Sequence, residues 1–310
     1  MTSPSVAPLN SVPRPRTASQ RLAGALANSF LLSHGRNLMR RNEANYFLPL
    51  SKWEKLSAGI YLILRDYSTG LFPPTFADQQ AAYEAEMNFY SSMTGLDRAE
   101  VIKGHIVKPF WDARHFGTYS RSFTKLVQVF ESVGLKPGNR LLELGCGSGW
   151  VAEFLAIMGY RVVATSIGPD EIEIGHLRVK ALKARGIDDD KRLIFRRSPM
   201  ESVDEVLKDQ EPFDCVFVSE ALHHAYDWKK TIHTAYRCLK PGGWFILADE
   251  PNLIHTFVSY RIGRMTNTHE IGLSRKEMNA EMLKAGFRTT KVFSPRFDNR
   301  MSHLWMGGQR

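Results

Sequence analysis

A glycine-rich turn follows an apolar segment that carries one acidic residue. The run Leu141–Leu144 contains Glu143, and Gly145, Gly147 and Gly149 follow at alternate positions. Glycine adopts positive φ angles readily and lets a ligand approach the main chain closely. A helix-like segment comes next, and the N-terminus of a helix leaves backbone N–H groups free to bind a ligand. The chemistry that fits these residues is cofactor binding where a buried strand turns into a helix.

The spacing of these glycines excludes two common nucleotide-binding motifs in their strict form. A dinucleotide fingerprint requires G-x-G-x-x-G, and its third glycine would fall on Trp150 or Ala152 in this sequence. A phosphate-binding P-loop ends in Gly-Lys followed by Ser or Thr, and no lysine lies near the turn. The pattern that remains is acid-x-Gly-x-Gly-x-Gly, beginning at Glu143.

A second group of residues able to do acid–base chemistry lies after a second apolar strand. Glu220, His223 and His224 follow the segment 213–219. A carboxylate or an imidazole in this place fits a general base, provided that it lies within hydrogen-bond reach of the proton that it removes. The alternative interpretation is structural, with the two histidines packing and closing the turn.

The segment 251–273 is long for a connection between a strand and a helix, and we expect it to be rich in loops. It follows Asp249 and Glu250, which end a strand at the same edge of the expected sheet. It also contains Arg261 and Arg264, whose charge suits an anionic or polyhydroxylated substrate. We therefore expect this insertion to contribute to substrate binding.

Strands and helices alternate from residue 140 onward, which implies right-handed βαβ units and a parallel sheet. The fold class expected is α/β, with a Rossmann-like, doubly wound, seven-stranded sheet that is mostly parallel and has an antiparallel last strand. Ligands then bind beyond the carboxyl ends of the strands. Strands are expected at 140–144, 161–165, 193–195, 214–218, 244–248, 290–293 and 303–306, and helices at 76–94, 122–133, 151–158, 170–185, 228–238 and 274–285.

Three motifs together resemble those of the class I S-adenosylmethionine (SAM) dependent methyltransferases that act on small molecules. They are the acid–glycine turn, the strand with its Leu-His-His tail at 213–224, and the Leu-Lys-Pro-Gly-Gly-Trp turn at 239–244. They occur in the family's order and spacing, and the resemblance covers about residues 118–310. It implies SAM as the cofactor and methyl transfer to a small-molecule acceptor. The group methylated is expected to be a hydroxyl of a sugar or natural product.

The resemblance also implies which residues bind the cofactor and carry the chemistry. Glu143 and the backbone of Gly145, Cys146 and Gly147 would face the methionine part of SAM. The other cofactor contacts expected are Tyr119, Gly149, Ser166, Ile167, Met200, Glu201 and Ser219. The catalytic residues are expected among His224, His223 and Glu220.

The sequence departs from the family pattern after the second and third strands. The family usually has an acid at the end of the second strand to bind both ribose hydroxyls, and this chain has Ser166. Serine makes neutral hydrogen bonds but not a bidentate charged one; the nearest acid, Asp170, looks like a helix N-terminal residue. After the third strand, Met200 and Glu201 stand where the family often has an acid for the adenine amino group. These departures leave open a SAM-binding scaffold or regulatory protein without catalysis.

An aromatic segment precedes the first strand of the sheet. Phe110, Trp111 and Tyr119 lie in residues 108–119, together with several cations. We expect this segment to close over the cofactor or acceptor as a lid. The alternative is that it only packs the helical extension onto the core.

The composition of the 310 residues bounds the remaining possibilities. Three widely spaced cysteines and no His/Cys cluster argue against disulfides and a metal site, and no apolar run of ~18 residues predicts a membrane span. The net charge is +9, but residues 1–42 hold six arginines and no acid. The charge is therefore largely a property of the tail, which argues against nucleic acid as a partner. An RNA methyltransferase remains an alternative because of the basic total.

The domain organisation expected is a disordered tail (1–20), a mostly helical extension or lid (21–117) and a methyltransferase domain (118–310). Residues 21–41 read as an amphipathic basic helix with Leu22, Leu26, Phe30 and Leu31 on its apolar side. Three interpretations stay open for this helix: surface packing on the domain, peripheral membrane contact, and a mitochondrial transit peptide. A cytoplasmic location is expected, or a mitochondrial one in the last case. The acceptor and the oligomeric state stay open.

Overall fold

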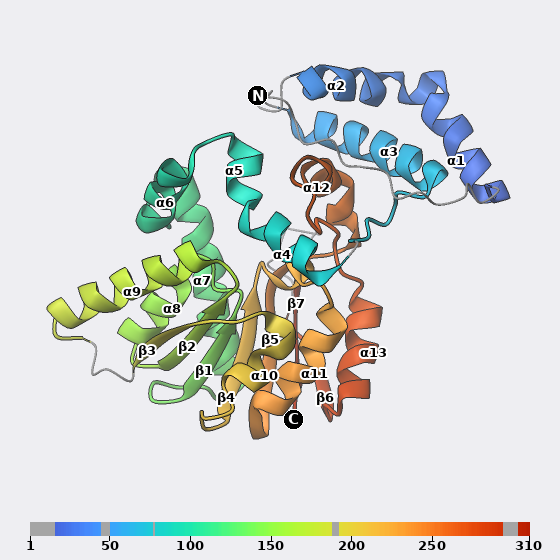
Figure 1. Cartoon of the computed structure of the whole chain (residues 1–310). Helices are drawn as coiled ribbons and strands as arrows, with labels where there is room; N and C mark the ends of the chain where they lie inside the picture. The colour runs from blue at the N-terminus through green and yellow to red at the C-terminus, as the bar shows by residue number, and fades with distance from the viewer. Residues whose placement is uncertain (1–15, 45–49, 77, 188–191, 294–302) are drawn as a thin grey trace. The chain divides into compact units, whose positions relative to one another are not determined.

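The computed structural model describes residues 16–44, 50–76, 78–187, 192–293 and 303–310, and the chain forms two compact units, 1–75 and 76–310 (Figure 1). The predicted disordered tail lies outside the described residues as far as residue 15. Its last residues do not fit the prediction, because helix α1 begins at Ala18, where Thr17 forms a capping box with Gln20. In the described part of the chain, no helix is long and apolar enough to cross a membrane.

The first unit consists of helices α1 (Ala18–Asn28), α2 (Ser33–Ala44) and α3 (Lys52–Thr69), with the 3₁₀ turn η1 (Phe30–Leu32) between α1 and α2. Both α1 and α2 pack against α3. The single basic helix expected over 21–41 is therefore wrong. Ser29 has an extended backbone, and its N–H bonds to the carbonyl of Leu26, which ends α1.

The second unit is built on a seven-stranded sheet with the order β3-β2-β1-β4-β5-β7-β6. The first five of these strands pair in parallel, and β7 is antiparallel to both of its neighbours. The predicted fold class is confirmed. The strands are β1 (Arg140–Leu144), β2 (Arg161–Ser166), β3 (Leu193–Arg197), β4 (Phe213–Ser219), β5 (Leu239–Pro251), β6 (Thr289–Val292) and β7 (His303–Gln309).

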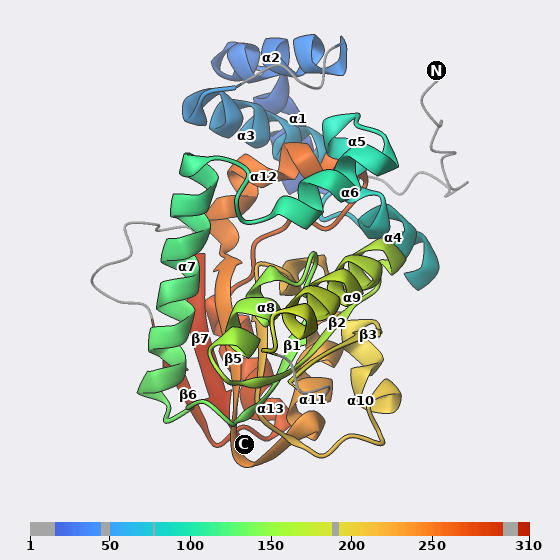
Figure 2. The same ribbon diagram turned by 90° about the vertical axis from the view of Figure 1, so that its left-hand side faces the viewer.

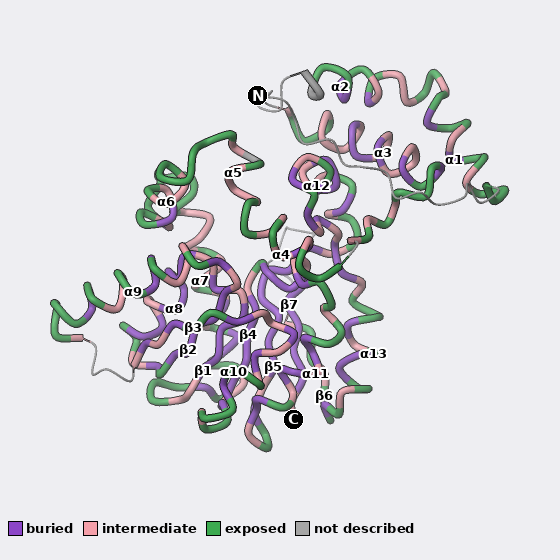
Figure 3. The backbone as a smooth tube through the Cα atoms, viewed as in Figure 1, coloured by how far each residue is buried: buried purple, intermediate pink, exposed green. Residues whose placement is uncertain are grey.

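Helices cover both faces of this sheet, and its central strands are buried (Figures 1, 2 and 3). One core cluster includes Phe130, Leu155 and Leu182 from α7, α8 and α9; the other includes Ile232 and Met278 from α11 and α13. The helices and 3₁₀ turns of this unit are α4 (Gln79–Met87), α5 (Phe89–Thr94), α6 (Arg98–Val107), α7 (Ala113–Ser132), α8 (Trp150–Ile157), α9 (Pro169–Ala184), η2 (Met200–Ser202), α10 (Val203–Val206), η3 (Leu222–His224), α11 (Trp228–Cys238), α12 (Leu253–Thr266) and α13 (Arg275–Ala285).

The segment 251–273 is mainly helical, so the expectation of a loop-rich insertion is wrong. Helix α12 begins directly after β5, because the side chain of Asn252 accepts a hydrogen bond from the N–H of Ile254 and caps the helix. Strand, cap and helix follow one another without an intervening loop. The insertion therefore places a helix at the carboxyl end of β5.

Two helices before the sheet also differ from the expectation. The helix expected over 76–94 is interrupted at Asn88, which separates α4 from α5. Helix α7 begins at Ala113 rather than Ser122, because Asp112 caps it by accepting from the N–H of His115. This helix crosses the expected boundary between residues 117 and 118, and the two compact units divide after Thr75 instead.

Candidate active site

The three glycines of the turn all have positive φ angles: 70° at Gly145, 50° at Gly147 and 72° at Gly149. A Cβ atom at Gly145 would lie 2.6 Å from Cε of Met200 and 2.7 Å from Cβ of Ala221. Glycine is therefore required both by the backbone conformation and by the close approach of the neighbouring loops. The turn ends where Trp150 begins α8, as the sequence predicts.

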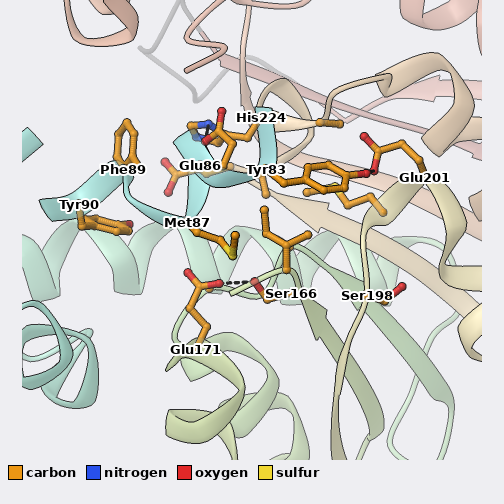
Figure 4. A pocket seen from close by; sticks show the side chains of 17 residues that line it. Tyr83, Glu86, Met87, Phe89, Tyr90, Ser166, Glu171, Ser198, Glu201 and His224 are labelled. Atoms are coloured by element: carbon orange, nitrogen blue, oxygen red, sulfur yellow. Dashed lines mark hydrogen bonds and ion pairs between the residues drawn. The ribbon is translucent and has the colours of Figure 1, made fainter. Parts of the chain in front are cut away.

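A pocket lies beyond the carboxyl ends of β1, β2 and β4, under α4 and α5, and encloses about 810 Å³ of empty space including its opening to solvent (Figure 4). Eight of the residues predicted from the sequence line it: Gly145, Gly147, Ser166, Ile167, Met200, Glu201, Glu220 and His224. The lining also includes residues that the sequence did not single out, among them Tyr83, Glu86, Met87, Phe89, Tyr90, Glu171 and Ser198. The pocket thus brings the glycine turn and the Leu-His-His segment to one place.

Glu171 supplies the acid that the end of β2 lacks. Ser166 donates a hydrogen bond to the Glu171 carboxyl, which lies beside it in the pocket (Figure 4). Burial raises the pKa of Glu171 and outweighs this hydrogen bond. The neighbouring Asp170 instead pairs with Arg98 of α6. The sequence shows that acids lie in the first turn of α9, close to the end of β2. It does not show which of the two adjacent acids faces the pocket.

Glu143 is buried with an unsatisfied carboxyl oxygen. Its side chain is 2% exposed, and its Oε2 has no hydrogen-bond partner among the described residues. Burial raises the pKa of this carboxyl to about 8, although the N–H of Ala152 and the charge of Lys108 act in the opposite direction. A buried oxygen of this kind costs free energy unless a donor reaches it. It therefore fits a bound cation such as the ammonium group of SAM.

The Lys108 ammonium lies on the rings of the predicted lid segment. Its Nζ is 4.8 Å from the ring centre of Tyr119 and 5.6 Å from that of Trp111. Arg178 of α9 holds this segment against the glycine turn, because its guanidinium donates to the carbonyls of Lys108 and Ser148 at 3.0 and 2.6 Å. A cation is thus fixed next to the turn that carries Glu143.

Five predicted cofactor residues, Glu143 and four others, and the predicted catalytic His223 do not line the pocket. Cys146 is buried and its N–H donates to the carbonyl of Thr165 at 2.9 Å. Tyr119 packs in an aromatic group with its ring 5.6 Å from that of Trp150. Gly149 and Ser219 lie in the backbone at the ends of the turn and of β4. Their roles toward a cofactor stay predictions.

His223 is held by Glu250, which lies at the end of β5 and is fully buried. The Glu250 carboxylate accepts from the N–H groups of Ala221 and Leu222 at 2.7 and 2.9 Å, and it lies 2.9 Å from Nδ1 of His223. These bonds outweigh the effect of burial and lower the pKa of Glu250. Glu250 therefore caps the η3 turn and fixes the segment that presents His224.

His224 lies in the pocket between two carboxylates. Its Nδ1 is 2.9 Å from a carboxylate oxygen of Glu86 of α4, and its Nε2 is 3.7 Å from one of Glu270. Figure 4 shows the side chains of His224 and Glu86 next to each other. Burial alone would lower the pKa of this imidazole, but the two carboxylates outweigh it and raise the pKa to about 9. His224 is therefore a cation at neutral pH.

A second imidazole–carboxylate group adjoins the pocket at Glu220. One carboxylate oxygen each of Glu220 and Asp249 and one ring nitrogen of His303 all lie within 4.8 Å of one another. Nδ1 of His303 is 2.9 Å from Asp249 Oδ1, and Ser122 of α7 donates to Asp249 Oδ2 at 2.6 Å. Both Glu220 and Asp249 have left-handed backbones, with φ angles of 51° and 56°. Such strained residues gather at functional sites.

No sequence motif indicates a role for His303 or Ser122. His303 reaches the site because β7 pairs antiparallel with β5, in a register that places it opposite Pro251. Ser122 reaches it because α7 covers this edge of the sheet and bonds to Asp249. Neither pairing follows from a motif.

The sequence matches a family model and known relatives. A family model described as a methyltransferase domain matches residues 111–292. The chain is 28% identical over 185 residues to the S-adenosyl-L-methionine-dependent Diels-Alderase iccD of Talaromyces variabilis, covering 56% of this chain and 59% of that protein. It is 23% identical to the ubiquinone biosynthesis O-methyltransferase of Bordetella bronchiseptica, covering 63% and 82%. The chain thus spans about three fifths of the first relative's length.

The fold is similar to that of solved methyltransferase structures. The magnesium protoporphyrin IX methyltransferase of Synechocystis PCC 6803, with bound S-adenosylhomocysteine (SAH), superposes with a TM-score of 0.52 at 18% identity. The superposition covers 73% of this chain and 99% of that one. At this identity the likeness concerns the fold.

Proposed function

This chain belongs to the class I SAM-dependent methyltransferases, and from that premise we propose that it methylates a hydroxyl group of a small, largely apolar molecule. The observation that carries the proposal is the Asp249–His303 pair, which lies beside Glu220, a residue of the pocket wall. A hydroxyl acceptor must lose a proton, and this pair is built to accept one. The name of the Bordetella relative, an O-methyltransferase, supports the same class of acceptor.

The residues present fit SAM. The unsatisfied Glu143 oxygen suits its ammonium group, and Lys108 is the nearby cation for its carboxylate. Glu171 and Ser166 together offer the acceptors that ribose hydroxyls need. Met200 lines the pocket beyond β3, where an adenine ring would lie. When bound, SAM supplies an electrophilic methyl group on its sulfonium.

His303 is the proton acceptor in this proposal. Asp249 engages Nδ1 of the ring, which orients Nε2 as the basic atom. Burial alone would lower the pKa of His303, but the Asp249 carboxylate outweighs it and raises the pKa above the ordinary value. The acceptor O–H bond breaks as the proton moves to Nε2. The oxygen freed of its proton would then accept the methyl group that bound SAM supplies, with SAH as the second product.

His224, the first catalytic candidate from the sequence, serves a different role in this proposal. With a pKa of about 9 and two carboxylates beside it, the imidazole already carries its proton at neutral pH. It is a poor base there. We assign it to holding α4 over the pocket through Glu86, while Glu220 faces the acceptor.

The acceptor side of the pocket favours an apolar or aromatic scaffold. Helices α4 and α5 contribute Tyr83, Met87, Phe89 and Tyr90 to the wall (Figure 4). Aromatic and thioether groups pack well against flat apolar ligands, but they offer few hydrogen-bond partners to a ligand with many hydroxyl groups. A phenol or a hydroxylated natural product fits this wall better than a free sugar does.

The test uses full-length protein, SAM labelled in its methyl group, and ring compounds in matched pairs that differ only in carrying –OH or –NH₂. Label is expected in the hydroxyl member of a pair. His303→Gln is expected to lower kcat by about 10²–10⁴-fold, to leave SAM affinity unchanged, and to remove the fall of kcat at acidic pH that protonation of His303 causes. Label in the amines alone, or an unchanged kcat in His303→Gln, contradicts the proposal.

A matched control comes from an imidazole–carboxylate pair between α11 and α13. His233 lies 2.8 Å from Glu281, and neither residue belongs to the group of Glu220, Asp249 and His303. His233→Gln removes the same kind of contact and is expected to leave kcat and its pH dependence unchanged. An equal loss of activity in both variants would mean that His303 acts through stability.

A second candidate is a reaction that depends on bound SAM without methyl transfer. The similarity to a SAM-dependent Diels-Alderase favours it. Measuring SAH decides between the two, because methyl transfer produces one SAH for each product. The RNA methyltransferase alternative is not favoured: residues 76–310 carry 32 Lys/Arg and 29 Asp/Glu, a net charge of only +3.

A further inference from the structure

An exposed apolar face runs along α1 and continues into η1. Leu22 and Leu26 are one helical turn apart and are 63% and 41% exposed, and Phe30 and Leu31 are 89% and 82% exposed. Side chains four residues apart lie on the same face of a helix. Large apolar groups gathered in this way mark an interaction surface more often than scattered ones do.

The packing of α1 explains why these side chains face outward. The helix contacts α3 through its small residues: Ala23 and Ala27 are buried, and a Cβ atom at Gly24 would lie 3.3 Å from Cβ of Ser68. The two helices approach closely through the small residues of α1, so the large residues of α1 lie on its opposite side. The three-helix unit therefore does not bury Leu22, Leu26, Phe30 and Leu31 in its own core.

The charge of this unit indicates the chemistry of what covers the face. Residues 1–75 contain nine Lys/Arg and three Asp/Glu, so they carry a net charge of +6 of the chain's +9. Arg21 of α1 and Arg40 and Arg41 of α2 are exposed. Neither α1 nor η1 contains an acidic residue. An exposed apolar strip on a unit with this excess of arginines complements a surface that is anionic outside and apolar below.

We propose that the α1–η1 face is a docking site for an anionic lipid surface. Leu22, Leu26, Phe30 and Leu31 enter the boundary between headgroups and acyl chains, and the arginines stay at the level of the phosphates. The contact is peripheral. It brings the enzyme to acceptors that dissolve in a membrane, but it does not depend on the identity of the acceptor or on methyl transfer.

Flotation of the full-length protein with lipid vesicles tests the proposal. Binding is expected to phosphatidylcholine vesicles that contain phosphatidylglycerol, and to fall at least tenfold with phosphatidylcholine alone or in high salt. The double variant Phe30→Glu with Leu31→Glu is expected to lose at least tenfold in partitioning. Leu177→Glu with Leu283→Glu is the matched control, since these leucines are 50% and 51% exposed on α9 and α13.

Four outcomes overturn the proposal. They are absence of binding to anionic vesicles, equal binding by the Phe30/Leu31 variant, a lowered thermal midpoint of that variant without lipid, and dissociation of an oligomer in sedimentation. A lowered midpoint would place the face inside the folded protein, and dissociation would assign it to a second copy of the chain. No SAM is present in these experiments, so their result is separate from that of the methyl-transfer assay.

Discussion

At the scale of single residues, the proposed contact of Glu143 with the ammonium group of SAM can be tested through the buried carboxyl. Its pKa of about 8 means that the carboxyl is mostly protonated in the free protein at pH 6–7. A bound ammonium group favours the carboxylate and lowers this pKa. SAM binding is therefore expected to release close to one proton at about pH 7, and affinity is expected to rise up to tenfold between about pH 6 and 7.

Calorimetric titration in buffers of different ionisation enthalpy measures this proton. Glu143→Gln is expected to bind SAM more weakly and to release no proton. Equal heats in all buffers for the wild-type protein would contradict the assignment of Glu143 to the ammonium group.

Two adjacent acids of α9 provide a second comparison at the residue scale. Glu171 lines the pocket beside Ser166, whereas Asp170 pairs with Arg98. Glu171→Gln removes a charged acceptor for the ribose hydroxyls and is expected to weaken SAM binding by about 10–100-fold, or about 1.5–3 kcal/mol. Asp170→Asn is the control and is expected to bind SAM within about twofold of wild type. Equal affinities of the two variants would remove Glu171 from the ribose site.

At the scale of elements, the contact between α4 and η3 depends on the charge of His224. The folded-state pKa of about 9 lies above the ordinary 6.5, so the stabilising contribution is fully present below about pH 6.5 and is lost as pH rises through about 9. The shift in the pKa of His224 contributes at most about 3 kcal/mol to the free energy of unfolding, since each pKa unit corresponds to about 1.4 kcal/mol. The unfolding free energy of wild type is expected to exceed that of His224→Gln near pH 6 and to approach it near pH 10.

Denaturant unfolding across this pH range measures the difference. Glu86→Gln is also expected to lower the unfolding free energy near pH 6 more than near pH 10, because the substitution removes one of the two carboxylates that raise the pKa of His224. A difference between wild type and His224→Gln that stays constant from pH 6 to pH 10 would show that the imidazole contributes packing and not charge.

The elements themselves were largely predictable where their causes are local. Positive φ angles at Gly145, Gly147 and Gly149, and caps such as Ser274 on α13, are set by neighbours in the sequence. The expectation was wrong for residues 251–273, where a capping asparagine begins α12 immediately after β5. It was also wrong for residues 21–41, where one extended residue, Ser29, divides the helix.

For the whole molecule, the sequence alone determined the alternating strands and helices, the glycine turn and the family that they resemble. Only the tertiary structure decided which side chains meet. The order β4-β5-β7 brings His303 to Asp249, and the rotation of α9 turns Glu171, not Asp170, into the pocket. The packing of α1 through Ala23 and Ala27 turns its large residues outward. Backbone turns and apolar periodicity depend on adjacent residues, whereas these pairings join segments whose separation in space is fixed only when the sheet and helices are assembled.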